Sequence, residues 1–133
     1  MTKRILAFVV AGVALAAGFE AQARLSAKSP ALAHMVFFNL KDHSEGERAR
    51  FVASCEKYLK GHAGTVYFSV GVRADDVDES VSVKDFDVAL HVVFESKDGK
   101  AKYLESERHK QFVEENGSKF AGVRVFDSYL AQP

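Results

Sequence analysis

The stretch Phe86–Phe112, FDVALHVVFESKDGKAKYLESERHKQF, contains most of the information that decides the fold. Its first part, Phe86–Phe94, is an almost uninterrupted apolar run with the length of a strand, which is typical of a strand buried on both faces. Ser96 follows and can cap a helix through its side-chain oxygen. A further helical turn is expected from about Glu107 to Glu115. The stretch therefore predicts a buried strand followed by two helical segments.

The rest of the chain supplies three more strands and one more helix. Short β-branched and aromatic runs predict strands at His34–Leu40, Thr65–Val72 and Val123–Leu130. The helix between the first two begins at the capping box Ser44–Glu47, and Gly61 ends it in a left-handed conformation. The order βαββαβ predicts an α+β, ferredoxin-like protomer, in which a four-stranded antiparallel sheet carries both helices on one face.

The strands are apolar on both of their alternating faces. In the first strand, Val36, Phe38 and Leu40 form one set, while Met35 and Phe37 form the other. A sheet with helices on one face and water on the other should alternate cleanly between apolar and polar residues. The second face therefore needs cover as well, and we expect a second copy of the chain to supply it, sheet against sheet, in a twofold homodimer.

The first residues have the pattern of a secretory signal peptide. A short basic region at Lys3 and Arg4 precedes the apolar run Ile5–Phe19, and Ala21-Gln22-Ala23 matches a cleavage site. The alternative is an uncleaved membrane anchor, but the apolar run is shorter than the roughly 20 residues that a spanning helix needs. We expect a signal peptide over 1–23, a linker over 24–33 and one domain over 34–130. The mature protein would be periplasmic or secreted, with no membrane attachment.

Charge and cysteine content argue against a nucleic-acid-binding surface and against an internal disulfide. Without the signal peptide, 18 − 2 = 16 basic and 18 − 1 = 17 acidic residues remain, so no positive excess marks a nucleic-acid-binding surface. The single cysteine, Cys55, allows no internal disulfide. It has helical spacing from Phe51 and Leu59, which indicates a small buried apolar side chain.

Three features together resemble the stress-responsive dimeric α/β-barrel (Dabb) domain family. These are a first strand that begins with His34, the run Phe86–Ser96, and Tyr103 followed by His109 with Phe112 just beyond. The resemblance covers about His34–Leu130. It implies a ferredoxin-like protomer whose sheet joins a partner's sheet to form a barrel, and a cleft between sheet and helices that can hold a small hydrophobic ligand.

The resemblance also implies candidate site residues. A few plant members are polyketide cyclases that use a tyrosine and a histidine, and Tyr103 and His109 fall at the positions of that pair. His34 falls where a pocket-lining histidine begins the first strand, and Val36, Phe38 and Leu90 share its pocket as expected ligand contacts. The chain departs from the family at Ser106-Glu107-Arg108-His109, where many members have His-Pro-Ala-His.

Geometry limits the pairing of Tyr103 with His109. Six residues of continuous helix rise about 9 Å and turn the two side chains away from each other, so the helix must break between them. Ser106 can cap a new turn and supply the break. With the break, His109 can act as a general base and Tyr103 can hold an oxyanion or donate a proton. The alternative is that Tyr103 and His109 have no chemical role and lie at the edge of the core, where their polar ends form hydrogen bonds.

The other histidines and the acidic loop are weaker candidates for a functional site. We expect His91 to face the dimer contact, His43 and His62 to be solvated, and the acidic loop at Asp75–Glu79 to lack the spacing of a calcium site. No motif for a metal, phosphate or nucleotide cofactor occurs, so we expect neither metal nor cofactor. Three hypotheses stay open: an exported small-ligand-binding domain of unassigned activity, a cyclase-like or isomerase-like enzyme, and a structural dimerisation module.

Overall fold

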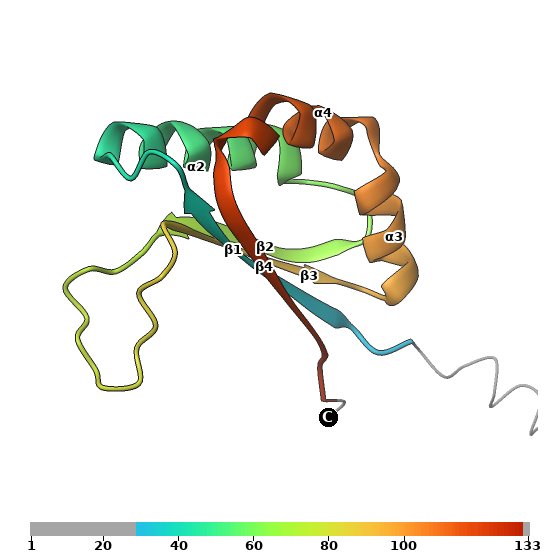
Figure 1. Cartoon of the computed structure of the whole chain (residues 1–133). Coiled ribbons are helices and arrows are strands. Elements are labelled where there is room, and N and C mark those ends of the chain that lie inside the picture. Colours follow the sequence, from blue (N-terminus) through green and yellow to red (C-terminus); the bar gives the residue numbers. More distant parts are fainter. Residues whose placement is uncertain (1–28, 132–133) are drawn as a thin grey trace, which may run out of the picture.

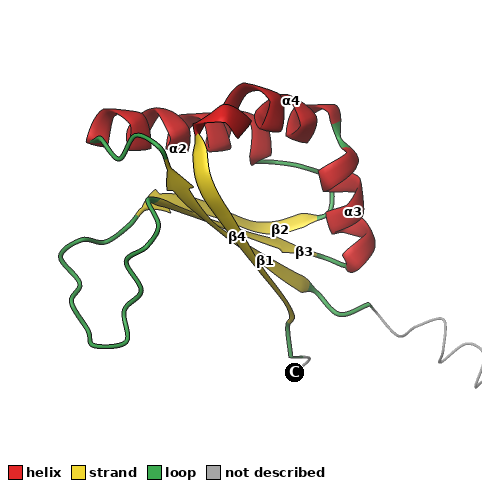
Figure 2. Ribbon diagram, viewed as in Figure 1, coloured by secondary structure: helices red, strands yellow, loops and turns green. Residues whose placement is uncertain are grey.

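The computed structural model describes residues 29–131 as a sheet covered on one face by helices (Figures 1 and 2). The elements, in chain order, are β1 (Leu32–Leu40), α2 (Glu45–Leu59), β2 (Thr65–Val72), β3 (Val88–Phe94), α3 (Lys97–Glu105), α4 (Glu107–Asn116), a 3₁₀ turn (Gly117–Lys119) and β4 (Phe120–Tyr129). All strand pairs are antiparallel and the sheet order is β2-β3-β1-β4. This confirms the ferredoxin-like prediction. The predicted signal peptide lies outside the described residues.

Three strands begin elsewhere than the sequence predicts, because pairing and not composition sets their ends. β1 begins at Leu32, inside the expected linker, since Leu32 pairs with both Phe94 and Tyr129. β4 begins at Phe120 instead of Val123, because it continues past Gly122 to pair with Leu40 across a register shift. β3 begins only at Val88, where its pairing with Phe38 of β1 starts.

Serine side chains begin each α-helix of residues 29–131. The hydroxyls of Ser44, Ser96 and Ser106 accept hydrogen bonds from the backbone N–H three residues further on. The first cap is not the reciprocal box predicted from the sequence. The N–H of Ser44 donates to Asp42 Oδ1 at 2.9 Å, while the Glu47 carboxylate accepts from Arg50. Because Asp42 already accepts the hydrogen bond of the Ser44 N–H, Glu47 pairs with Arg50 instead.

The core lies between the sheet and the helices. Buried residues of β1 and β3 alternate with partly buried ones, and the buried set faces α2, α3 and α4. Phe38, Phe51, Phe112 and Phe120 form an aromatic cluster with ring centroids 4.9–6.4 Å apart. Cys55 is fully buried beside them, and burial raises the pKa of its thiol to about 12. The thiol is therefore a small core group, as predicted.

No helix of residues 29–131 lies over the opposite face of the sheet (Figure 2). It presents Met35 and Phe37 of β1 with the alternate residues of its neighbours, and the exposed fractions of Tyr67 and Phe126 are 55% and 50%. Among the described residues, no helix is long and apolar enough to cross a membrane.

Candidate functional site

Tyr103 of α3 lies at the centre of a cluster of three histidines. Its side chain is buried, with 2% exposed, and its ring lies 4.9 Å from His109, 4.9 Å from His62 and 6.4 Å from His34, measured between centroids. The three histidines come from α4, the turn after α2, and β1. We call Tyr103, His34, His62 and His109 the tyrosine–histidine cluster. The structure thus brings together the residues that the sequence proposed for chemistry, and adds His62.

Ser106 makes the contact between Tyr103 and His109 possible. Its hydroxyl donates to the Tyr103 carbonyl at 2.7 Å and accepts from the His109 N–H at 3.2 Å. Its backbone is extended, with φ −65° and ψ 147°, so one serine ends α3 and begins α4. The break changes the direction of the chain between α3 and α4 (Figure 1) and lays the imidazole of His109 against the phenol ring, with ring centroids 4.9 Å apart. The predicted break at Ser106 is confirmed.

Arg108 holds the same turn from the other side. Its guanidinium donates to the carbonyls of Lys57 and Lys60 at 3.0 and 2.8 Å, which are carbonyls at the C-terminal end of α2 left without helical partners. This ties the start of α4 to the end of α2. The chain therefore fixes this turn with Ser106 and Arg108, where many relatives by resemblance have a proline.

His34 is held by an aspartate on the neighbouring strand. The register of β1 and β4 places His34 opposite Asp127, and His34 Nδ1 lies 2.7 Å from Asp127 Oδ1. Lys100 of α3 donates to the other oxygen of the same carboxylate. Sequence reasoning missed Asp127 and Lys100. The alternation of the last strand put Asp127 on the face of Val123 and Val125, but only the strand register shows that this position meets His34.

His62 corrects a prediction. We expected it to be solvated, but it is half-buried, and its Nε2 lies 2.8 Å from the Tyr58 carbonyl, where a ring N–H donates. The reason is Gly61, whose φ of 74° reverses the chain after α2 and returns His62 to the helix end. His43 is 61% exposed as expected, yet it is also 2.9 Å from the carboxylate of Asp87. His91 lies on the uncovered face, 3.1 Å from the Ser69 hydroxyl.

The pKa values of two imidazoles in the cluster, those of His34 and His109, are lowered, which favours their neutral forms. Burial lowers the pKa of His109, and the nearby His34 and His62 lower it further. Burial also lowers the pKa of His34, although the hydrogen bond to Asp127 acts in the opposite direction. Burial raises the pKa of the Tyr103 hydroxyl. Near neutral pH, His34 and His109 are therefore imidazoles able to accept a proton, beside a phenol that keeps its own.

The expected ligand contacts Val36, Phe38 and Leu90 are part of the packed core. Val36, Phe38 and Leu90 face the helices with 5%, 4% and 1% exposed, and Phe38 belongs to the aromatic cluster. His34 contacts Asp127, which lines a surface depression. That depression, which we call the α3–β4 groove, has a volume of about 370 Å³ and lies between α3 and β4. Its lining residues are Leu32, Lys97, Lys100, Ala101, Leu104, Asp127, Ser128 and Tyr129.

The histidines of the cluster are not arranged as a metal-ligand set. Within residues 29–131, no three side chains of histidine, cysteine, aspartate or glutamate gather closely enough to hold a metal ion. The three imidazoles of the cluster surround a phenol ring, so they do not converge on one point. Acid–base chemistry and ligand binding are the processes that this arrangement can support.

Solved structures share the fold across nearly the whole described domain. A Dabb family protein with a ferredoxin-like fold from Mesorhizobium loti is 19% identical, with a TM-score of 0.65 over 78% of this chain and 100% of that one. A dimeric ferredoxin-like protein of unknown function from Thermobifida fusca is 12% identical, with a TM-score of 0.64 over 77% and 93%. A hydroxynitrile lyase from Passiflora edulis is 15% identical, with a TM-score of 0.63 over 78% and 96%. These likenesses show the fold.

The sequence comparisons identify the family. No curated protein gives a significant match to the chain. The sequence model of one family, described as the Stress responsive A/B Barrel Domain, matches residues 32–130. That match spans every described strand and helix. The chain therefore belongs to the stress-responsive A/B barrel domain (Dabb) family, as its sequence predicts.

Proposed function

We propose that this protein is an exported, homodimeric domain that binds a small, mainly apolar molecule in the α3–β4 groove. The observation that carries the proposal is the position of the groove. It opens directly beside the Asp127–His34 pair, and His34 in turn contacts Tyr103. A surface depression backed by a buried titratable cluster is the usual form of a small-molecule site.

The lining of the groove indicates the chemistry of its ligand. Leu32, Leu104 and Tyr129 provide apolar contact, and the last two are 39% and 58% exposed in the free chain. Lys100 and Asp127 form an ion pair among them. A ligand with an apolar body and one carbonyl or carboxylate oxygen would bury the apolar walls and accept a hydrogen bond from Lys100.

The proposed dimer rests on the uncovered face of the sheet. Large apolar side chains on that face are exposed in one chain, above all Tyr67 and Phe126. A second sheet packed on it would bury them. The similar protein from Thermobifida fusca is described as dimeric. Export is proposed from the sequence pattern of residues 1–23 alone.

A second candidate function is acid–base catalysis in the same site. It is favoured by one specific feature, the chain of contacts from Asp127 through His34 to Tyr103 and His109. An aspartate on Nδ1 fixes the tautomer of His34 and leaves Nε2 to take a proton. His109 as base and Tyr103 as oxyanion or proton partner would serve a cyclase-like or isomerase-like step. One structural neighbour, from Passiflora edulis, is an enzyme by its name.

Binding can be tested with 1-naphthoate, an apolar carboxylate of suitable size, by mapping backbone amide shifts in NMR spectra. The proposal expects saturable shifts along α3 and the C-terminal half of β4, together with the His34 imidazole. The variant Ala101→Phe, which fills the groove, should abolish them. Shifts confined to the uncovered face of the sheet would contradict the proposed site. An absence of binding by this and related apolar anions would favour the purely structural dimerisation module.

The two candidate functions separate at His109 once a substrate or ligand is in hand. The His109→Gln variant should abolish turnover if His109 is the base, while it should largely preserve affinity if the protein only binds. An unchanged rate on a confirmed substrate would remove His109 from catalysis.

A further inference from the structure

The connection between β2 and β3, Arg73–Asp87, is much longer than the roughly 2–5 residues that join most antiparallel neighbours. It projects from the sheet on the side away from the helices (Figure 1). Loops of this length in a compact domain are usually functional. We call this segment the β2–β3 arm.

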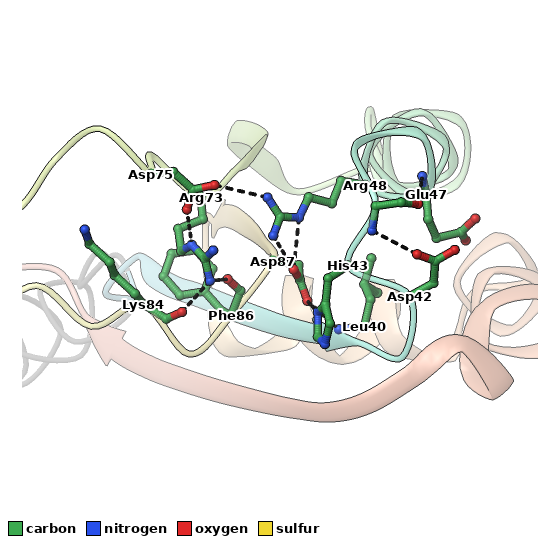
Figure 3. Close-up of polar contacts among 11 residues, drawn as sticks. Leu40, Asp42, His43, Glu47, Arg48, Arg73, Asp75, Lys84, Phe86 and Asp87 are labelled. Carbon is green, nitrogen blue, oxygen red and sulfur yellow. Dashed lines mark hydrogen bonds and ion pairs between the residues drawn. The ribbon is translucent and has the colours of Figure 1, made fainter.

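The base of the arm is firmly held (Figure 3). Asp87 is buried, with 1% exposed, and its carboxylate accepts from the Leu40 N–H at 2.8 Å and from Arg48 Nε at 3.0 Å. Arg48 also donates to Asp75 at 3.2 Å, and Arg73 donates to the Phe86 carbonyl at 3.0 Å. Both legs of the arm are therefore fixed to α2 and to each other, so the arm leaves the domain in a set direction.

The tip of the arm is apolar and acidic at once. Val77 and Val81 are 46% and 82% exposed, so contact with another surface would bury apolar area on both side chains. Asp76 and Glu79 lie between and beside them and are exposed. Solvation explains the acids but not the valines. A tip of this composition fits an apolar surface with a cation at its rim.

Such a surface lies on the uncovered face of the same chain. A depression of about 280 Å³ is lined by Phe37, Val83, Phe86, Arg124 and Phe126. We call it the outer groove. Phe37 packs edge-on against Phe86 and Phe126, at centroid distances of 5.0 and 5.7 Å, and this shapes its walls. Arg124 lies at the rim of the groove; its side chain is 43% exposed and forms an ion pair with Asp85 of the same chain, which leaves part of the guanidinium open to further contacts.

The arm is long enough to reach a second copy. Each leg of the arm, from the base to Val81, has at least six residues. At roughly 3.3 Å per extended residue, a leg can span about 20 Å. Two sheets packed face to face lie about 10 Å apart. An arm that leaves on the uncovered side of one sheet can therefore pass alongside a partner sheet, and a twofold axis would give each copy one arm and one outer groove.

We infer that the β2–β3 arm seats Val81 in the outer groove of a second copy, with its acidic neighbours near Arg124 at the groove's rim. The inference rests on the homodimer proposed above. It adds a specific contact, in which the two copies exchange their arms. Burial of Val81 would stabilise the dimer, and the charged residues would fix how the two copies are aligned.

Sedimentation equilibrium of wild type, Val81→Asp and Val113→Asp tests the inference. The full chain is expressed in an exporting host, and mass spectrometry defines its processed N-terminus. Val113 is the matched control, because it is a valine 47% exposed on α4, on the helix side of the sheet. Val81→Asp should raise the dimer dissociation constant at least tenfold, while Val113→Asp should leave it unchanged.

The outcomes distinguish the two proposals. A wild-type dimer whose dissociation constant is the same in Val81→Asp overturns the arm exchange and leaves the dimer standing. A wild-type monomer at micromolar concentration overturns the dimer, and the arm exchange with it. Because Val81 is 82% exposed in the single chain, its substitution does not threaten folding.

Discussion

Two histidine–aspartate pairs in this protein have opposite distributions of burial. In the His43–Asp87 pair, 61% of the histidine side chain is exposed and 2% of the aspartate side chain. In the His34–Asp127 pair, the histidine is 7% and the aspartate 36% exposed. Both contacts are short, at 2.9 and 2.7 Å. The two pairs differ in which side chain is buried, the aspartate in the first and the histidine in the second.

Burial of the carboxylate makes the first pair structural. Asp87 accepts hydrogen bonds from Leu40, His43 and Arg48, which lower its pKa even though burial itself acts to raise it. Because both oxygens of this buried carboxylate already accept hydrogen bonds within the protein, Asp87 is not available to bind a ligand. In the second pair the imidazole is buried. Within residues 29–131 only Nδ1 of His34 is hydrogen-bonded, so its other nitrogen stays available beside Tyr103. The same two residue types therefore serve architecture in one place and acid–base potential in the other.

The largest expected effect breaks the first pair. Asp87→Asn removes a buried charge and leaves Arg48, only 14% exposed, without its main partner, so unfolding free energy should fall by about 3 kcal/mol. Asp127→Asn is the control, and we expect it to cost less than about 1 kcal/mol because that carboxylate is partly solvated. Urea unfolding at pH 7 measures both. Equal losses in the two variants would show that the distribution of burial does not separate the pairs.

The next effect concerns the break that forms the site. Ser106→Ala removes a hydroxyl that serves two helices and should lower stability by about 1 kcal/mol. Ser96→Ala removes the cap of α3 and should cost a similar amount. The two variants differ at the cluster: only Ser106→Ala should shift the His109 titration, followed by NMR of the imidazole. If Ser96→Ala moves it equally, Ser106 has no particular role in positioning His109.

A third prediction concerns pH. The pKa values of His34 and His109 are lowered, so each should titrate in NMR spectra below the ordinary value of about 6.5. The folded state then binds fewer protons than the unfolded state in that range. The stability contributed by these groups is thus present above pH 6.5 and lost as pH falls through the folded pKa values. Asp127→Asn removes a partner that raises the pKa of His34, so that pKa should fall further. A pKa of His34 above 6.5 in the wild type would refute this.

The smallest effect comes from an exposed ion pair near the cluster. Glu107 and Lys110 lie one turn apart on α4 at 2.8 Å, and both are largely exposed. Glu107→Gln should leave thermal stability and the His109 titration unchanged, since solvent screens such pairs. A shift of the His109 pKa in this variant would extend the electrostatic reach of the cluster to the surface.

The sequence predicted most of the fold because its local signals agree with one another. The serine caps, Gly61 and the apolar strands each point to the observed elements. It also placed Tyr103, His109 and the break at Ser106 in one site. Asp127, Lys100 and His62 could not be found in the same way. The contacts of Asp127 and Lys100 depend on strand register and on the closeness of α3 to β4, which local composition does not encode. The contact of His62 depends on the direction in which the chain turns after Gly61, although the glycine itself was recognised.

The central claim is that the protein is a dimer with a small-molecule site beside the tyrosine–histidine cluster. Native mass spectrometry of the chain purified from an exporting host, without added ligand and after incubation with cell extract, tests it most directly. We expect a dimer that carries a reproducible small-molecule adduct, and the loss of that adduct in the Ala101→Phe variant. A monomer, or a dimer that stays bare in every extract, would contradict it.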